Sequence, residues 1–294
     1  MKQLIECVPN FSEGRRQDVI DRIVAAMAQV PGARVLDVQS DLDHNRSVVT
    51  LVGPPEAILE AAFQGVACAA QLVDMDHHRG AHPRMGATDV VPFVPVQGVT
   101  MDDCVALARR LGERVGSELG IPVYLYEEAA ARPEWRNLAD VRRGEYEGLK
   151  ADIAADPGRT PDFGPAHLGT AGATAIGARP PLIAFNVYLN TADIAPAKAI
   201  AKAVRHSSGG FRFVKALGLL VEGQAQISMN LTDYSQTPIH RVLNMIHTEA
   251  AHHGLAITRC EVVGLLPAQA LFDAAQFYLQ LHDLSPDQIL ENRL

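Results

Sequence analysis

The sequence lacks the cysteine pairs that mark disulfide frameworks and zinc ribbons. Its four cysteines are far apart in 294 residues and form no Cys-x-x-Cys pair; they are Cys7, Cys68, Cys104 and Cys260. This usage is typical of reduced, mostly buried thiols. We therefore expect a cytoplasmic protein without disulfides.

Long apolar runs and an excess of positive charge are also missing. No uninterrupted apolar segment reaches the roughly 20 residues that cross a bilayer. The first seven residues lack the apolar core of a signal peptide and instead predict a strand. The net charge of −8 disfavours bulk attraction to nucleic acid or anionic lipid. We expect neither nucleic acid nor membrane as a partner.

Several catalytic and nucleotide-binding signatures are absent. Glycines recur between Phe163 and Gly177, but no Gly-x-Gly-x-x-Gly joins a strand to a helix and no Gly-Lys-Ser/Thr ends the stretch. No Gly-x-Ser-x-Gly elbow presents a serine nucleophile. The glycine-spaced stretch keeps two interpretations: a flexible linker between domains, or a backbone that closely approaches a flat ligand.

The elements that are present predict the same order twice. Apolar residues make up 48% and charged residues 20% of the chain, as in ordinary globular proteins. Hydrophobic periodicity predicts strand–helix–strand–strand–helix–strand in each half. In the first half these elements fall at residues 4–8, 16–29, 35–38, 47–52, 56–72 and 90–94. In the second half they fall at residues 182–187, 195–205, 216–221, 225–231, 239–252 and 257–263.

This order is that of the ferredoxin-like fold. We predict an α+β protein with two ferredoxin-like (βαββαβ) subdomains, residues 1–178 and 179–294, whose mainly antiparallel sheets face a ligand groove. A further helix and strand are expected at residues 105–119 and 123–126. The charged stretch after them predicts a helical excursion over residues 134–153 and then a Pro/Gly-rich connection.

A cluster of imidazoles and guanidiniums lies between the predicted helix at 56–72 and the strand at 90–94. Residues 77–89 contain His77, His78 and His82, and they are punctuated by glycine and proline, so the cluster must be a loop. The histidines keep three interpretations: helix caps bonded to loop carbonyls, a metal site without a helical His-x-x-x-His pair, or one general acid/base. Imidazole suits the last role because it exchanges protons near neutral pH.

Other polar residues stand where predicted strands begin or end. Asn10 follows the first strand, and Asn45 and Arg46 precede the strand at 47–52. Asparagines in such places are usually turn residues. Arg46 and Arg84 are candidates to clamp carboxylates bidentately, although solvated arginines also fit the pattern.

Several segments, in the same order, resemble glutamate formiminotransferases. They are residues 6–14 (ECVPNFSEG), 45–48, 53–56, 82–87 (HPRMGA), 89–93, 122–126, 143–147, 161–165 (PDFGP) and 183–186. The similarity is dense as far as Asn186 and thinner afterwards. A run of several long motifs in one order makes chance resemblance unlikely.

The resemblance implies transfer of a formimino group from N-formimino-L-glutamate to N5 of tetrahydrofolate, the co-substrate, without a metal, in a homodimer. It places the catalytic histidine on His82. The folate-binding stretch falls on Phe163, Gly164, Pro165, Ala166, His167, Leu168, Gly169, Thr170, Ala171 and Gly172. Residues 166–171 depart from the better-known animal sequences. In animals the domain is fused to a cyclodeaminase, for which this chain leaves no room, so we expect transferase activity alone.

The residues are chemically compatible with this reaction. The N5 amine attacks an amidine carbon, and one imidazole can remove the N5 proton and then protonate the departing glutamate nitrogen. Asp41 and Asp43 are candidates to orient His82, and Arg46 and Arg84 to hold the acidic substrates.

Three alternatives remain open from the sequence. One is a related folate enzyme with a formyl donor, N-formylglutamate or 5-formyltetrahydrofolate. The second is a metal-dependent hydrolase that uses the histidine cluster, and the third is a non-catalytic folate-binding module.

Overall fold

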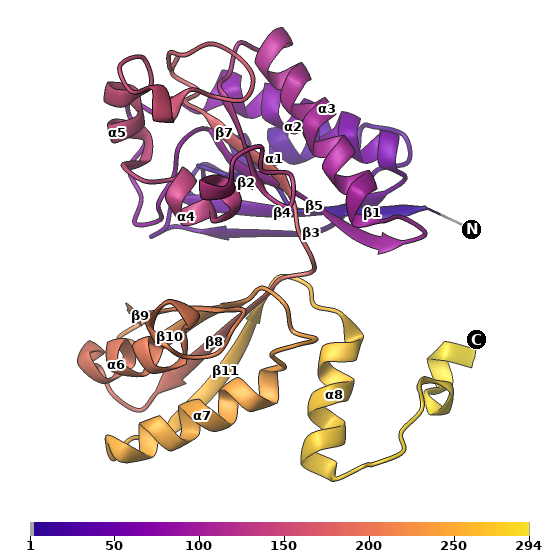
Figure 1. Ribbon diagram of the computed structural model, residues 1–294, viewed down its shortest axis with the longest axis vertical. Coiled ribbons are helices and arrows are strands. Elements are labelled where there is room, and N and C mark those ends of the chain that lie inside the picture. Colours follow the sequence, from indigo (N-terminus) through magenta and orange to yellow (C-terminus); the bar gives the residue numbers. More distant parts are fainter. Residues whose placement is uncertain (1–2, 294) are drawn as a thin grey trace. The chain divides into compact units, whose positions relative to one another are not determined.

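The computed structural model describes residues 3–293, which form two compact units with the boundary between Pro180 and Pro181. Figure 1 shows a layer of helices against a sheet in each unit. The predicted α+β class is confirmed, with two sheets that are mostly antiparallel. The units divide two residues beyond the boundary predicted from sequence.

A seven-stranded sheet organises the N-terminal unit. Its strands are β1 (Leu4–Cys7), β2 (Asn10–Phe11), β3 (Arg34–Asp41), β4 (Arg46–Gly53), β5 (Thr88–Gln97), β6 (Val123–Glu127) and β7 (Thr174–Ala178). Both β1 and β2 pair with β4 on one side and β5 on the other, so they act as one interrupted strand. With α1 (Gln17–Ala28) and α2 (Pro55–Leu72), the first part of this unit has the predicted ferredoxin-like order.

An extension enlarges this sheet beyond the ferredoxin-like pattern. After β5, α3 (Met101–Glu118) leads to β6, and β7 lies between β5 and β6, parallel to both. All five residues of β7 are buried. The interpretation of the whole glycine-spaced stretch as a flexible linker is therefore wrong. Its last part, residues 174–178, is a buried strand.

The predicted helical excursion over residues 134–153 is present but is broken into short helices. They are η1 (Pro133–Arg136), α4 (Leu138–Val141) and α5 (Glu145–Asp152), followed by η2 (Pro157–Arg159). Gly144 separates α4 from α5 with a φ of +84°, a conformation that glycine adopts without steric cost. The break turns the side chains of α5 toward the histidine loop, as the contacts below show.

The C-terminal unit is a complete ferredoxin-like domain. Its elements are β8 (Ile183–Leu189), α6 (Ile194–Val204), β9 (Val214–Val221), β10 (Gln224–Leu231), α7 (Ile239–His252) and β11 (Ile257–Val263). The strand order is β11-β8-β10-β9, and every pairing is antiparallel. One buried cluster of its own fills the space between sheet and helices.

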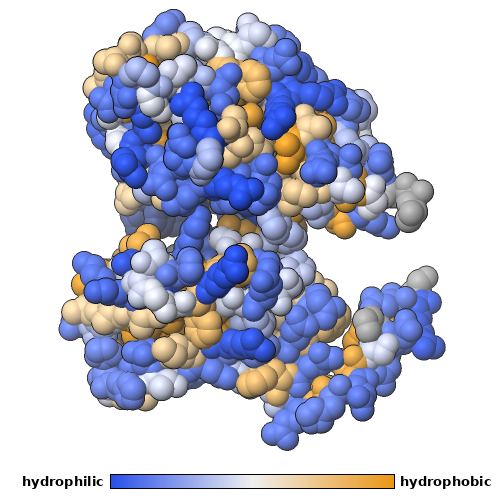
Figure 2. Space-filling view, viewed as in Figure 1, coloured by the Kyte–Doolittle hydropathy of each residue, from blue (hydrophilic) through white to orange (hydrophobic). Residues whose placement is uncertain are grey.

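Helix α8 (Ala268–Leu279), which the sequence reading did not predict, follows this domain and stacks Phe277 on His240 with ring centroids 4.4 Å apart. The remaining short helices are η3 (His206–Ser208), η4 (Pro286–Gln288) and η5 (Leu290–Arg293). Among residues 3–293, no helix combines the length and the hydropathy that a membrane span needs. On the face shown in Figure 2, hydrophilic residues predominate and hydrophobic ones form small patches.

Candidate active site

The loop that carries His82 connects α2 to β5 and is held by two neighbouring turns. The hydroxyl of Ser12 donates to the Gly86 carbonyl at 2.7 Å, and the Ser12 amide donates to the Ala87 carbonyl at 2.9 Å. The amide of Ala81, next to His82, donates to the Asp43 carbonyl at 3.1 Å. These bonds fix the loop on the sheet although it has no regular structure.

Arg46, the first residue of β4, contacts the half-buried His82 directly. Its Nη1 lies 2.5 Å from Nε2 of His82. Because a guanidinium only donates, Nε2 must accept and the ring proton must sit on Nδ1, which is buried without a partner. Burial, followed by the charges of Arg46 and Arg142, lowers the pKa of His82 to about 2. His82 is therefore neutral at physiological pH.

Asp41 supports a second imidazole rather than His82 itself. Its Oδ1 accepts from the backbone amide of His44 at 2.7 Å and lies 2.9 Å from the ring Nδ1 of the same residue. Although burial raises the pKa of Asp41, these bonds hold it below its usual value. The His44 ring stands edge-on to His82, with centroids 6.1 Å apart. The side chain of Asp43 is exposed, and its backbone carbonyl accepts the hydrogen bond from Ala81 of the histidine loop.

Asn45 and Asn10 make structural hydrogen bonds. Asn45 has a φ of +49°; its Oδ1 accepts from the Gly14 amide at 2.9 Å and its Nδ2 donates to the Arg79 carbonyl at 3.0 Å. It thereby joins the turn after β2 to the histidine loop. Asn10 donates to the Val8 carbonyl at 2.9 Å and is not among the residues that line the pocket around His82. Roles of both residues toward substrate remain predictions.

Arg84 is buried and already paired with carboxylates of the protein. Its Nη1 donates to Glu145 and its Nη2 to Glu147, both on α5, at 2.8 and 2.7 Å. Its Nε lies 3.4 Å from Nδ1 of His78. These contacts tie α5 to the histidine loop. In this structure Arg84 therefore binds two carboxylates of the protein itself, both on α5. A contact of Arg84 with substrate remains a prediction.

Asp89 and Arg142 complete the surroundings of His82, and neither was singled out from the sequence. The buried carboxylate of Asp89 accepts from the Met85 amide at 2.9 Å and pairs with Arg142, which follows α4. Nε of Arg142 is buried without a partner. The available signal was weak: Arg142 directly precedes one segment of the family resemblance, in an arginine-rich stretch.

These side chains close around His82 and leave a gap too small to hold a water molecule. It is lined by Ser12, His44, Asn45, Arg46, His78, His82, Arg84 and Asp89. The structure thus gathers His82, Asn45, Arg46 and Arg84, which the sequence singled out, from three separate segments of the chain.

The predicted folate stretch, residues 163–172, runs beside this loop. At its start, the Phe163 ring packs on Gly112 of α3 and the backbone of Phe163 and Gly164 packs on Gly116, so that a Cβ at either glycine would collide. At its end, the Thr170 carbonyl accepts from the Met75 amide and the Ala171 carbonyl from the Ala87 amide, both at 2.8 Å. Between these anchors, Ala166, His167, Gly169 and Thr170 are exposed, and half-buried Pro165 and Leu168 lie among them.

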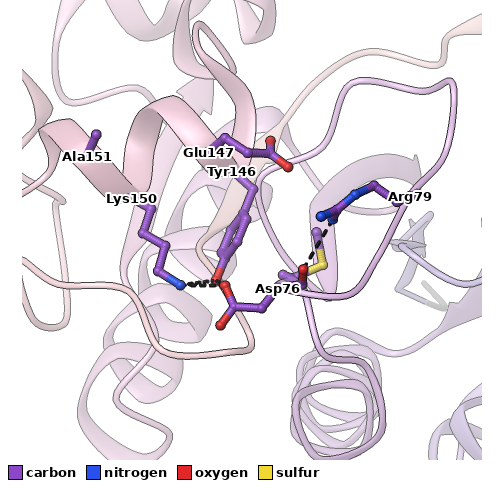
Figure 3. Close-up of a pocket in the computed structure, with 7 residues that line it drawn as sticks. Asp76, Arg79, Tyr146, Glu147, Lys150 and Ala151 are labelled. Atoms are coloured by element: carbon purple, nitrogen blue, oxygen red, sulfur yellow. Dashed lines mark hydrogen bonds and ion pairs between the residues drawn. The ribbon is translucent and has the colours of Figure 1, made fainter.

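A larger hollow of about 400 Å³, open to solvent, lies at Met75, whose amide is bonded to Thr170 of this stretch (Figure 3). It is lined by Met75, Asp76, Arg79, Tyr146, Glu147, Lys150 and Ala151. Figure 3 shows the Tyr146 hydroxyl and the Lys150 ammonium converging on the Asp76 carboxylate. Glu147 lies between the two cavities, because it lines this hollow and also pairs with Arg84 of the His82 pocket.

The histidine cluster does not converge on one point. Exposed His77 pairs with Asp74, and buried His78 places its Nε2 3.0 Å from the Asn45 carbonyl. Within residues 3–293, no three His, Cys, Asp or Glu side chains are arranged to hold a metal ion. The metal-dependent hydrolase therefore has no supporting geometry in this part of the chain.

Fold and site together define a two-unit α+β protein with a neutral histidine in a cationic pocket. The N-terminal subdomain of the formiminotransferase domain matches residues 4–179, and the formiminotransferase domain matches residues 184–292. The chain belongs to the formiminotransferase family.

Similar proteins cover the whole chain. A glutamate formimidoyltransferase of Thermoplasma acidophilum is 51% identical over 99% of this chain and 97% of its own length. A glutamate formimidoyltransferase of Streptococcus pyogenes serotype M1 is 48% identical over 100% of this chain and 99% of its own length. The formimidoyltransferase-cyclodeaminase of Sus scrofa is 45% identical over 97% of this chain but only 54% of its own length. The match to the bifunctional relative is thus confined to about half of that protein.

Proposed function

We propose that this chain is a glutamate formimidoyltransferase. It transfers the formimino group of N-formimino-L-glutamate to N5 of tetrahydrofolate and releases L-glutamate. Full-length relatives that bear this name support the reaction. The observation that carries the residue assignment is the neutral imidazole of His82, in a pocket that adjoins residues 163–172.

In this reaction His82 acts as the general acid/base. Nitrogen N5 attacks the amidine carbon, and Nε2 of His82 takes the N5 proton. The bond between the amidine carbon and the glutamate nitrogen then breaks, and the imidazolium returns the proton to that nitrogen. Protons balance over the two steps, and no covalent enzyme intermediate is formed.

Tetrahydrofolate lies along residues 163–172 in this proposal. The backbone bonds of residues 170–173 to residues 75 and 85–87 support this placement, because they fix the stretch beside the loop that carries the base. The neighbouring hollow of about 400 Å³ falls within the usual range of small-molecule sites.

The proposal is tested by mixing purified protein with tetrahydrofolate and N-formimino-L-glutamate and following the release of free glutamate. We expect folate-dependent release, and a decrease in turnover of about 10²–10⁴-fold for His82→Ala and His82→Asn, with folate binding retained. Unchanged turnover in His82→Asn would remove the catalytic role of this residue.

A formyl donor is the second candidate, and a parallel reaction with N-formylglutamate tests it. Faster glutamate release from the formyl than from the formimino compound would transfer the proposal to the formyl reaction on the same folate stretch. Folate binding without any turnover would leave a non-catalytic folate-binding module.

The proposal places the enzyme in the cytoplasm as a homodimer. The four cysteines are free thiols, as expected in a reducing compartment. Leu217 and Leu220 are more than half exposed on β9, an edge strand that offers unpaired backbone groups to a partner. Light scattering of the purified protein reports its oligomeric state.

A further inference from the structure

Two arginines near His82 are only partly neutralised: Asp89 and Asp41 attract Arg46 without forming an ion pair with it, and Arg142 shares Asp89. Arg46 is largely buried, and none of the carboxylates in residues 3–293 forms an ion pair with it. Within residues 3–293, its side chain forms one hydrogen bond, to Nε2 of His82. Arg142 pairs with Asp89 through Nη2, whereas its Nε is buried without a partner.

Such an arrangement is unfavourable unless an anion completes it. A buried cation without a counter-ion and a buried donor without an acceptor both destabilise the folded protein. Burial and the charge of Arg142 lower the pKa of Arg46 to about 10. Arg84, by contrast, already has Glu145 and Glu147 as partners. Arg46, which has no ion pair in the described part of the chain, and Arg142, whose Nε has no acceptor, are therefore the groups that a ligand would complete.

The contact of Arg46 with His82 has a second consequence. The lone pair on Nε2 is the one a general base needs, and here Nη1 of Arg46 occupies it. Nδ1 of the same ring carries the proton and faces a buried environment. In the empty site the base is thus blocked by the nearest cation.

We propose that Arg46 and Arg142 bind a carboxylate of the donor substrate, and that this carboxylate draws Arg46 away from His82 so that Nε2 can accept the N5 proton. The inference rests on the proposed function, because the donor is a glutamate derivative. It adds Arg142 to the substrate-binding residues and makes His82 active only when the donor is bound.

The other groups around the ring are consistent with this role. His44 approaches His82 edge-on and is held by Asp41, while Asp89 holds Arg142. Neither aspartate pairs with Arg46. A carboxylate that binds here would therefore meet the guanidinium of Arg46 and the unpaired Nε of Arg142, and guanidinium is the group best suited to planar anions.

The first test uses a ligand that cannot react. Glutarate has both carboxylates of the donor but no formimino group. We titrate it into the wild-type protein without folate and follow the side-chain ¹⁵N shifts of His82, assigned by the signal lost in His82→Gln. The expected result is saturable binding that moves the Nε2 resonance of His82, while exposed His252 and His253 do not move.

The second test is the variant Arg142→Gln with Arg143→Gln as its matched control. Arg143 is the next residue, is 78% exposed and pairs only with Asp140 among the carboxylates. In Arg142→Gln we expect the Kd for glutarate and the KM for the donor to rise about 10–100-fold, with the KM for tetrahydrofolate unchanged. The control is expected to behave like the wild type.

A third variant separates ligand binding from a merely structural role. In Arg46→Gln the His82 resonance of the empty protein should resemble that of the glutarate-bound wild type, and glutarate should no longer move it. If this variant does not fold, the wild-type titration and Arg142→Gln still decide the question.

Wild-type affinity for glutarate in Arg142→Gln, or glutarate binding that leaves the His82 resonance unmoved, overturns the inference. These outcomes are distinct from failure of the proposed function. If the protein binds glutarate at His82 but transfers no formimino group, the proposed subsite stands and the proposed reaction is wrong. If the protein transfers the group but glutarate has no effect on His82, the proposed reaction stands and the proposed subsite is wrong.

Discussion

At the scale of the residue, the site keeps groups in arrangements that do not favour stability. His82, Arg46 and Arg142 leave two buried polar atoms unpaired and place two cations beside one imidazole. Such sites are expected where binding or catalysis requires them, because the rest of the fold must offset the cost. The protonation of His82 and its contact with the Asp41–His44 pair each lead to a prediction.

The first concerns stability against pH. The unfolded imidazole of His82 takes up a proton near pH 6.5, whereas the folded one remains neutral down to about pH 2. Between these values the unfolded state binds more protons, so the free energy of unfolding decreases as the pH falls. Urea unfolding at pH 7 and pH 5 should show the wild type losing about 1–2 kcal/mol more than His82→Gln. Equal losses would show that His82 is not buried as a neutral group.

The second prediction concerns the pair Asp41–His44. If Asp41 acts on His82 through His44, Asp41→Asn and His44→Gln should each lower turnover about tenfold. The double variant should be no slower than either single one, since both remove the same link. Additive losses in this double-mutant cycle would show that the two residues act separately.

Part of the site could be predicted from local sequence. His82, Asn45, Arg46 and Arg84 lie in distinctive segments, and the structure places all four on one pocket. Arg142 could not be identified in this way, because its link to Asp89 spans 53 residues and depends on how the short helices after β6 fold back. The partners of Arg84 on α5 were hidden for the same reason.

At the scale of the element, the stretch of residues 163–172, proposed to bind folate, depends on two glycines that face each other. Gly86 of the histidine loop and Gly172 of the stretch form an isolated bridge. A Cβ on Gly172 would lie 2.3 Å from the Met85 carbonyl oxygen, and its φ is +71°. Close approach of the two backbones thus requires glycine at this position.

The variant Gly172→Ala tests this dependence, with Gly169→Ala as the matched control. Gly169 lies in the same stretch but has no atom within 4 Å of an added Cβ. We expect Gly172→Ala to lose about 1–3 kcal/mol of stability and to raise the KM for tetrahydrofolate, because the stretch separates from the loop. Thermal unfolding should show little change in the control, whereas steady-state kinetics should show the raised KM for tetrahydrofolate in Gly172→Ala. A tolerant Gly172→Ala would contradict the role of the bridge.

The periodic elements could be predicted from the sequence, and the short ones could not. The helices and strands of both ferredoxin-like patterns have long apolar stripes or alternation, for example Val19, Ile20, Ile23 and Met27 on α1. Strand β7 has only five residues, Thr-Ala-Ile-Gly-Ala, and is buried on both faces, so no alternation marks it. Helix α8 was missed although it is 12 residues long, and only Ala270 is buried in it.

At the scale of the whole molecule, the two units have separate cores. The cluster of the C-terminal unit consists of residues 183–270 alone, and the sheet of that unit is complete without any strand from the other. A ferredoxin-like domain of this size buries enough surface to fold by itself.

We therefore expect residues 181–294 to fold as an isolated fragment. Circular dichroism should show mixed helix and strand, and heating should give one cooperative transition. The fragment should bind neither glutarate nor tetrahydrofolate, because His82, Arg46 and residues 163–172 belong to the other unit. A fragment without a cooperative transition would show that the second core depends on the first.

The position of β7 has a consequence for how the chain is made. This strand lies between β5 and β6 but follows both in sequence. On the ribosome, β6 therefore emerges with no neighbouring strand, and one edge of β5 stays open until residue 178 has left the exit tunnel. Open strand edges invite wrong pairing, and synthesis adds about 5–20 residues per second. For several seconds the open edge of β5 in the nascent protein can therefore pair wrongly unless a chaperone covers it. We expect the yield during overexpression to depend on the supply of chaperones.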